Sequence, residues 1–306
     1  MQYDLAIVGG GPAGVSAGIY AARKKLKTVL IAEMIGGQST DSMGVENWVG
    51  VEKIEGPALA SMMEKHLRAY EGEMLELKTG DRVTKVSGTE GNFSVETTNG
   101  TYQAKTVLMA SGGSRRKLEV PGAAQYEHKG VTYCASCDGP IFAGQDTVVI
   151  GGGNAGFETA AQLLAYAKSV TLLSRSEYRA DPVTVEKVLA HPNMKGIINV
   201  EPVEVKGEKF VTSLVYRSKD GGEPVEIPAG GIFVEIGMLP STDYAKGLIE
   251  LDAVGRVVTN PKNQQTSVPG IWAAGDCTDE LYHQNNIAAG DGVKALEDIY
   301  MHLHAR

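Results

Sequence analysis

The 306-residue sequence predicts an α/β fold made of two similar parallel-sheet domains, the second inserted into the first. Three observations support this prediction. A short apolar run and a glycine-rich turn open the chain at residues 4–14, and the same pattern recurs at residues 146–156. Both copies read aspartate, apolar strand, three glycines, one residue, alanine and glycine, which indicates a repeated structural unit. A further apolar strand at residues 269–276 then indicates that the chain returns to the first domain.

Composition limits the classes of function. The hydrophobic fraction of 42% and the charged fraction of 22% are typical of a soluble globular protein. A net charge of −8 argues against nucleic acid and anionic membranes as partners. The sequence shows neither a signal peptide nor an apolar stretch long enough to span a bilayer. Three cysteines are too few for a disulfide framework, so we expect a reducing cytoplasm in which one pair cycles.

The first repeat reads as a dinucleotide site. The strand at residues 4–8 is followed by Gly9, Gly11 and Gly14 in a G-x-G-x-x-G pattern and by a helix to about Lys25. Such glycines allow a tight turn, close approach of a pyrophosphate and close packing of helix on strand. Glycine turns are common, but the next strand, residues 28–32, ends in Glu33, where an acid can bind ribose hydroxyls.

The segments that follow complete this domain. Two polar loops, residues 36–38 and 46–48, are expected near the same pocket, although ordinary turns fit them as well. Pro57 starts a helix with an apolar stripe. Residues 74–109 alternate short strands with turn signals, which predicts a small antiparallel insertion before a core strand that ends near Gly112.

A Cys-x-x-Cys motif lies between the two repeats. Cys134 and Cys137 can close a small disulfide ring, and this spacing tends to lower the pKa of one sulfur. Asp138 directly follows and can supply or remove the proton that thiol–disulfide exchange moves. Half of a zinc site and two ordinary buried thiols are the alternatives. The position between two nucleotide motifs favours redox chemistry.

The second repeat carries Gly151, Gly153 and Gly156, but its next strand ends in Ser174 and Arg175 where an acid is expected. An arginine here, with Arg179 nearby, favours the 2′-phosphate of NADPH over a bare ribose. The alternative is that both arginines simply flank acidic residues on the surface. Strand-like pieces at residues 197–227 mirror the first insertion, and residues 231–237 close the domain as a buried strand.

The last part of the chain returns to the first domain. Asp276 follows the strand at residues 269–276 and can hold a polyol hydroxyl of a flavin. Cys277 reads as an inert core thiol. The final helix has an apolar stripe that predicts packing against the first domain or a partner subunit.

Together these motifs resemble the low-molecular-weight thioredoxin reductases, and they are similar to the C-terminal flavoprotein half of the bacterial alkyl hydroperoxide reductase flavoprotein. The resemblance implies two Rossmann-like, three-layer domains, an FAD domain at residues 1–113 and 243–306 and an NAD(P)H domain at residues 114–242. The implied FAD residues are Gly9, Gly11, Pro12, Ala13, Gly14, Glu33, Gly37, Gln38, Asn47, Gly112, Gly275, Asp276 and Gln284. The implied NADPH residues are Gly151, Gly153, Asn154, Ala155, Gly156, Ser174, Arg175, Arg179, Ile236 and Gly237.

The resemblance also implies a mechanism. Electrons pass from NADPH through FAD to the cysteine pair, Cys137 meets the flavin, Cys134 attacks a thioredoxin- or glutaredoxin-like protein, and Asp138 is the general acid. A homodimer and a rotating inner domain are implied as well. Ser174 and Arg175 depart from the His-Arg-Arg typical of NADPH-using members, so NADH remains possible. Because the sequence begins directly at the first domain, without the thioredoxin-like extension of the hydroperoxide-reductase relatives, we expect a separate substrate protein.

Other readings stay open. The electron donor could instead be ferredoxin or a reduced flavin, and the electrons could supply a peroxiredoxin system. A flavin oxidase would pass electrons directly to oxygen. In a different class, a redox sensor or a zinc-holding module would use Cys134, Cys137, Cys277 and either His128 or His283. We expect no metal.

Overall fold

The computed structural model describes residues 2–42 and 44–305 and divides the chain into two compact units. The first unit comprises Met1–Ser114 and Leu239–Arg306, and the second comprises Arg115–Met238. The chain passes between the units at β7 (Gly113–Arg115) and β16 (Met238–Pro240), which pair as a two-stranded sheet. The predicted α/β class is confirmed.

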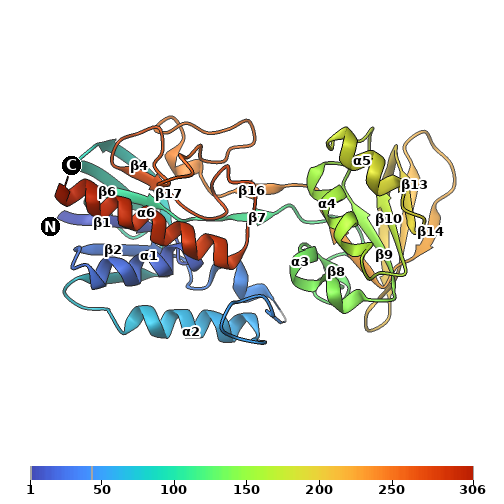
Figure 1. Ribbon diagram of the computed structural model, residues 1–306, viewed down its shortest axis with the longest axis horizontal. Helices are drawn as coiled ribbons and strands as arrows, with labels where there is room; N and C mark the ends of the chain where they lie inside the picture. Colours follow the sequence, from blue (N-terminus) through green and yellow to red (C-terminus); the bar gives the residue numbers. More distant parts are fainter. Residues whose placement is uncertain (1, 43, 306) are drawn as a thin grey trace. The chain divides into compact units, whose positions relative to one another are not determined.

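The first unit is built on one sheet of strand order β3-β2-β1-β6-β5-β4, with β17 also pairing with β6 (Figure 1). Its strands are β1 (Gln2–Val8), β2 (Thr28–Ala32), β3 (Leu75–Thr79), β4 (Val83–Thr89), β5 (Asn92–Thr97), β6 (Thr101–Met109) and β17 (Ile271–Ala273). Its helices are α1 (Pro12–Arg23), η1 (Gly37–Asp41), α2 (Gly56–Arg68), η3 (Asp243–Ala245) and α6 (Asn285–Ala305).

One strand in this sheet differs from the prediction. Leu75–Thr79 pairs parallel with β2 and extends the nucleotide fold, whereas the sequence predicted an antiparallel piece. The helix α2 supplies the crossover that a parallel neighbour requires. Only β4, β5 and the first half of β6 form the expected antiparallel meander, while the second half of β6 pairs with β17.

Both faces of this sheet are covered, as expected for its central parallel strands β1 and β2, which are largely apolar. Leu5 and Ile7 of β1 pack in one core cluster with α1, α2 and α6, while Ala6 and Val8 face a second cluster. Gly292 allows α6 to lie directly on α1, because a Cβ there would stand 2.2 Å from the carbonyl oxygen of Ala13. The last helix therefore packs on the first domain, one of the two placements that the sequence predicted.

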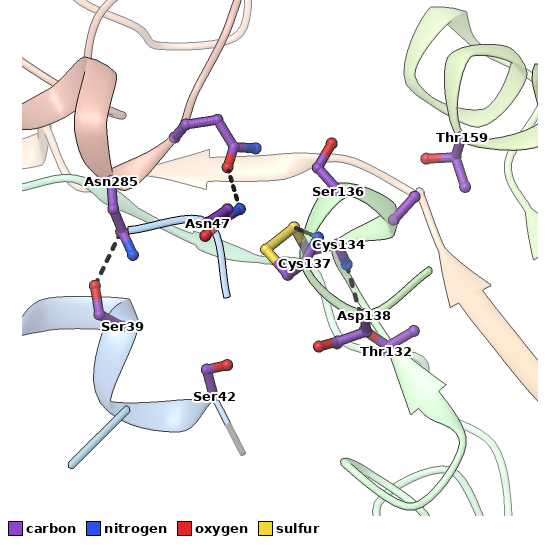
Figure 2. The surroundings of a disulfide bond; sticks show 12 residues. Ser39, Ser42, Asn47, Thr132, Cys134, Ser136, Cys137, Asp138, Thr159 and Asn285 are labelled. Carbon is purple, nitrogen blue, oxygen red and sulfur yellow. Dashed lines mark hydrogen bonds between the residues drawn. A yellow bond between two sulfur atoms is a disulfide. The ribbon is translucent and has the colours of Figure 1, made fainter. Parts of the chain in front are cut away.

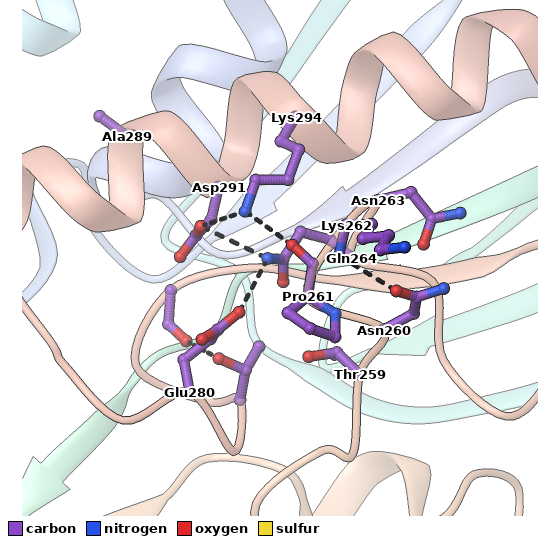
Figure 3. Close-up of polar contacts among 12 residues, drawn as sticks. Thr259, Asn260, Pro261, Lys262, Asn263, Gln264, Glu280, Ala289, Asp291 and Lys294 are labelled. Atoms are coloured by element: carbon purple, nitrogen blue, oxygen red, sulfur yellow. Dashed lines mark hydrogen bonds and ion pairs between the residues drawn. The ribbon is translucent and has the colours of Figure 1, made fainter.

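A polar cluster ties α6 to the segment before β17 (Figure 3). The amide of Gln264 donates to Glu280 at 3.3 Å and to Asp291 at 3.4 Å, and Lys294 donates to the carbonyl of Pro261 at 3.0 Å. Gln264 and Asp291 are almost fully buried. Hydrogen bonds between these buried groups fix the start of α6 against the chain that leads into β17.

The second unit repeats the arrangement on a smaller parallel sheet of order β11-β10-β9-β15-β8. Its strands are β8 (Val131–Thr132), β9 (Asp146–Ile150), β10 (Ser169–Leu173), β11 (Met194–Ile197) and β15 (Gly231–Val234), with a separate antiparallel sheet of β12 (Val200–Gly207), β13 (Val211–Ser218) and β14 (Val225–Pro228). Its helices are α3 (Ala135–Asp138), η2 (Gly139–Phe142), α4 (Asn154–Leu163) and α5 (Pro182–Leu189). The sequence reading had no counterpart for α5, whose N-cap Asp181 accepts from the backbone of Val183 and Thr184.

Candidate active site and nucleotide cradles

The glycines of the first repeat form a cradle with one open position. A Cβ at Gly9 would stand 2.2 Å from the carbonyl oxygen of Ala110, and one at Gly14 would stand 1.9 Å from that of Gly9. By contrast, a Cβ at Gly11, the N-cap of α1, meets nothing within 4 Å. The packing therefore excludes side chains at two positions, and the third exposes backbone at a helix N-terminus, where a pyrophosphate fits.

Other predicted residues of the first unit lie beside this cradle. A Cβ at Gly37 would stand 3.2 Å from the Cα of Gly11, and one at Gly275 would stand 3.3 Å from the Cβ of Ala13. Asp276 thus follows a strand end that lies against the start of α1.

Two loops that are distant in sequence meet in the first unit. The amide of Asn47 donates to Gln284 at 3.2 Å, and the hydroxyl of Ser39 donates to Asn285 at 2.9 Å (Figure 2). Asn47 and Gln284, both predicted to bind FAD, are therefore neighbours. The remaining predicted FAD residues are distributed along these elements: Pro12 begins α1, Glu33 follows β2 and pairs with Arg82 at 3.5 Å, Gln38 lies in η1, and Gly112 follows β6.

The second cradle repeats the first. A Cβ at Gly151 would stand 2.1 Å from the carbonyl oxygen of Glu235, one at Gly156 would stand 1.9 Å from that of Gly151, and Gly153 again faces open space. Asn154 and Ala155 begin α4, and Ile236 and Gly237 follow β15. The side chain of Asn154 accepts from the backbone N–H of Asp181 at 2.9 Å, so it holds the neighbouring turn.

The segment after β10 presents positive charge. Arg175 and Arg179 are exposed, and among the described residues neither forms an ion pair with Glu177 or Asp181. Lys219 adds a cation that the sequence did not indicate, because its ammonium group donates to the carbonyl of Arg175 at 3.3 Å. Ser174 is buried, and its hydroxyl donates to the carbonyl of Ser176.

The two cysteines form a disulfide across a single helical turn (Figure 2). Cys134 is the N-cap of α3, and its sulfur accepts a hydrogen bond from the backbone N–H of Cys137 at 3.2 Å. Such a bond stabilises a thiolate on Cys134 once the pair is reduced. Cys277 lies in the core of the first unit, where burial raises the pKa of its thiol to about 11. Its thiol is therefore inert at neutral pH.

Asp138 is held by a residue that the sequence did not indicate. The hydroxyl of Thr132 donates to the carboxyl of Asp138, and the same oxygen accepts from the backbone N–H of Cys134 at 3.4 Å (Figure 2). Burial raises the pKa of Asp138 above its usual range, opposed by the Thr132 hydrogen bond and the charge of His128. A carboxyl that keeps its proton to higher pH is suited to act as a general acid.

A second buried carboxyl lies at the second cradle. Glu235 accepts from the hydroxyl of Thr159 on α4 at 2.9 Å and pairs with Arg115 at 3.6 Å. Burial raises the pKa of Glu235, while Arg115 and Thr159 act in the opposite direction. The ion pair with Glu235 thus holds the guanidinium group of Arg115 beside the second cradle.

Comparisons with known proteins agree with this architecture. The family model described as "Pyridine nucleotide-disulphide oxidoreductase" matches residues 3–292. The chain is 42% identical over 304 residues to one subunit of the alkyl hydroperoxide reductase of Pseudomonas aeruginosa and 39% identical over 303 residues to "NADH dehydrogenase" of Bacillus subtilis. Each match spans 98% of this chain but only 58% of the relative.

Solved structures match over the whole chain. The thioredoxin reductase of Streptococcus pyogenes superposes with a TM-score of 0.91 at 34% identity, covering 100% of this chain and 99% of that one. The enzyme of Giardia duodenalis superposes with a TM-score of 0.93 at 33% identity, with 99% of each chain covered. No helix within the described residues is long and apolar enough to cross a membrane.

These findings confirm the resemblance drawn from the motifs, and the family and its structural neighbours imply FAD and a pyridine nucleotide as cofactors. Two glycine cradles, each with an open helix N-terminus, fit two dinucleotides. A close cysteine pair fits a redox-active disulfide. The chain belongs to the pyridine nucleotide-disulphide oxidoreductase family.

Proposed function

We propose that this protein is an NADPH-dependent disulfide reductase that passes electrons through FAD and the Cys134–Cys137 pair to a thioredoxin- or glutaredoxin-like protein. The observation that carries the proposal is the Cys134–Cys137 disulfide in the unit that contains the second cradle. Asp138, whose carboxyl accepts a hydrogen bond from Thr132, directly follows this disulfide in the chain. We further propose a cytoplasmic homodimer, with the first unit as the FAD domain and the second as the NADPH domain.

Different residues would bind each of the two cofactors. When bound, NADPH supplies a hydride and FAD relays the electrons to the disulfide. The first cradle, with Asp276, Asn47 and Gln284, would hold FAD. The second cradle would hold NADPH, with Arg175 and Arg179 around its 2′-phosphate. Lys219 supports the same choice, because it brings one more positive charge to Arg175.

The thiol chemistry then follows from the geometry at α3. The Cys134 thiolate, stabilised by the N–H of Cys137, attacks one sulfur of the carrier disulfide and forms a mixed disulfide. The carrier sulfur that leaves takes the proton of Asp138. Cys137 then attacks the Cys134 sulfur, which releases the second carrier thiol and restores the disulfide, so that two electrons have moved to the carrier.

A second candidate also has specific support. One relative named as an alkyl hydroperoxide reductase subunit shares 42% sequence identity with this chain. The electrons would in that case serve a peroxiredoxin. NADH is the matching alternative donor, since another relative carries the name NADH dehydrogenase.

A pair of anaerobic titrations tests the proposal. The FAD-reconstituted protein is mixed with NADPH or NADH, the flavin band is followed, and oxidised thioredoxin, glutaredoxin or peroxiredoxin is then added. We expect bleaching by NADPH and turnover with thioredoxin or glutaredoxin, both of which need an intact flavin site. Cys134→Ser is the control: it should lose turnover and keep bleaching. In a separate aerobic assay, NADPH-driven oxygen consumption at the same rate in wild type and Cys134→Ser, without carrier turnover, would instead identify an oxidase.

A further inference from the structure

Helix α4, which begins in the second cradle, also holds the turn that carries the two cysteines. The side-chain amide of Gln162 donates to the carbonyl of Ala135 at 3.2 Å. The hydroxyl of Ser136 donates to the carbonyl oxygen of the same amide, also at 3.2 Å. Ala135 and Ser136 are the two residues between the sulfurs, so one amide group binds both of them.

The turn that follows α4 also contacts the redox turn, residues 134–139, which carries the two cysteines. A Cβ at Gly139 would stand 2.0 Å from the hydroxyl of Tyr166, so a side chain directly after Asp138 would have to displace the ring of Tyr166. Ala135 is buried in one core cluster with Phe157 and Leu163 of α4. The redox turn thus contacts both α4 and Tyr166, which follows α4.

We propose that Gln162 is a positioning residue for the disulfide: its amide holds Ala135 and Ser136 in the geometry of the closed ring and so favours the disulfide over the dithiol. This inference rests on the proposed function, in which the pair cycles between the two states. Gln162 touches neither sulfur and acts only through the residues between them.

The physical reason is the entropy of ring closure. Two thiols form a disulfide more readily when the chain between them is already restrained, because less conformational freedom is lost on closure. The two hydrogen bonds of Gln162 restrain this segment in the dithiol state as well. Loss of a typical hydrogen bond changes an equilibrium constant by about 3- to 10-fold, and we expect an effect of that size.

The test measures the disulfide–dithiol equilibrium of the full-length protein in glutathione redox buffers, with peptide mass spectrometry after thiol alkylation. Two glutathione molecules reduce the pair and leave as one glutathione disulfide, so neither nicotinamide nor a carrier protein is needed. Gln162→Met keeps the length of the side chain and removes both hydrogen bonds. We expect this variant to shift the equilibrium toward the dithiol by about 3- to 10-fold. Ser136→Ala removes one of the two bonds and should shift it in the same direction by less.

Gln103→Met is the matched control. It removes a comparable hydrogen bond, to Ser94 at 3.1 Å in the sheet of the first unit, and should leave the equilibrium unchanged. A purely structural role for Gln162 would lower the melting temperature of Gln162→Met at an unaltered equilibrium constant, and that result overturns the inference. Equal disulfide–dithiol equilibrium constants in wild type, Gln162→Met and Ser136→Ala would also overturn the inference. A wild-type pair that fails to exchange with glutathione at all would overturn the proposed function and this inference with it.

Discussion

Replacing Thr132 by valine should change the pH dependence of disulfide turnover. The hydroxyl of Thr132 donates to the carboxyl of Asp138 and accepts from the backbone N–H of Cys134. Valine has nearly the same shape but lacks the hydroxyl, so the charged carboxylate of Asp138 loses a donor in a largely buried place. Because that hydrogen bond lowers the pKa of Asp138 and burial raises it, Asp138 in the variant retains its proton to higher pH.

The size of the effect follows from the chemistry of the lost bond. A hydrogen bond to a charged group contributes about 1.5–3 kcal/mol. That free energy corresponds to about a 10- to 100-fold change in the protonation equilibrium of Asp138. As a general acid, Asp138 is active when protonated. The fall in turnover on the alkaline side of the pH profile should therefore begin at higher pH in Thr132→Val.

The assay is the pH profile of carrier disulfide reduction at saturating NADPH. Thr132→Ser retains the hydroxyl and should reproduce the wild-type profile. Asp138→Asn should lower the rate about 100-fold and remove the alkaline limb. An alkaline limb at the same pH in wild type and Thr132→Val would refute the role assigned to this hydrogen bond.

Three further predictions concern the cradles and the buried acid. Gly11→Ala should leave the free energy of unfolding of the flavin-free protein unchanged and weaken FAD binding in a fluorescence titration. Gly14→Ala should lower the free energy of unfolding by about 2 kcal/mol or more, because its Cβ meets a carbonyl oxygen. Equal effects of the two substitutions would contradict the roles assigned to these glycines. Burial raises the pKa of Glu235, so the wild type loses stability as pH rises above the ordinary glutamate range. In urea denaturation, Glu235→Gln should therefore gain stability relative to wild type as pH rises above the ordinary glutamate range, and a stability difference that does not change with pH would rule this out. Arg175→Ala should weaken NADPH binding more than NADH binding in calorimetry; equal losses would assign the arginine to another role.

The sequence was informative where local patterns carry the structure. Both glycine cradles, the strands that lead into them and the cysteine turn follow from spacing, since G-x-G-x-x-G and Cys-x-x-Cys act over a few residues. The repeat also predicted the inserted second domain. The strand Leu75–Thr79 was assigned wrongly because strand direction depends on the crossover through α2 and not on its own residues.

Side-chain partners were harder to predict than elements. Gln162 contacts the redox turn from 26 and 27 residues away, and Thr159 reaches Glu235 from 76 residues away. Such pairs form only after a helix has packed on a sheet, and no local pattern indicates them. Thr132 lies close to Asp138 in sequence, yet a threonine at a strand end is too common to single out.

The central claim is that electrons reach the sulfur pair from the bound nucleotides, and counting reducing equivalents tests it most directly. The FAD-loaded protein is titrated anaerobically with NADPH while the flavin absorbance and the free thiols are measured. We predict that the wild type takes up about twice the reducing equivalents of a variant with both Cys134→Ser and Cys137→Ser, because the disulfide accepts one electron pair and the flavin another. Equal uptake by the two proteins, with no new thiols in the wild type, would contradict the account.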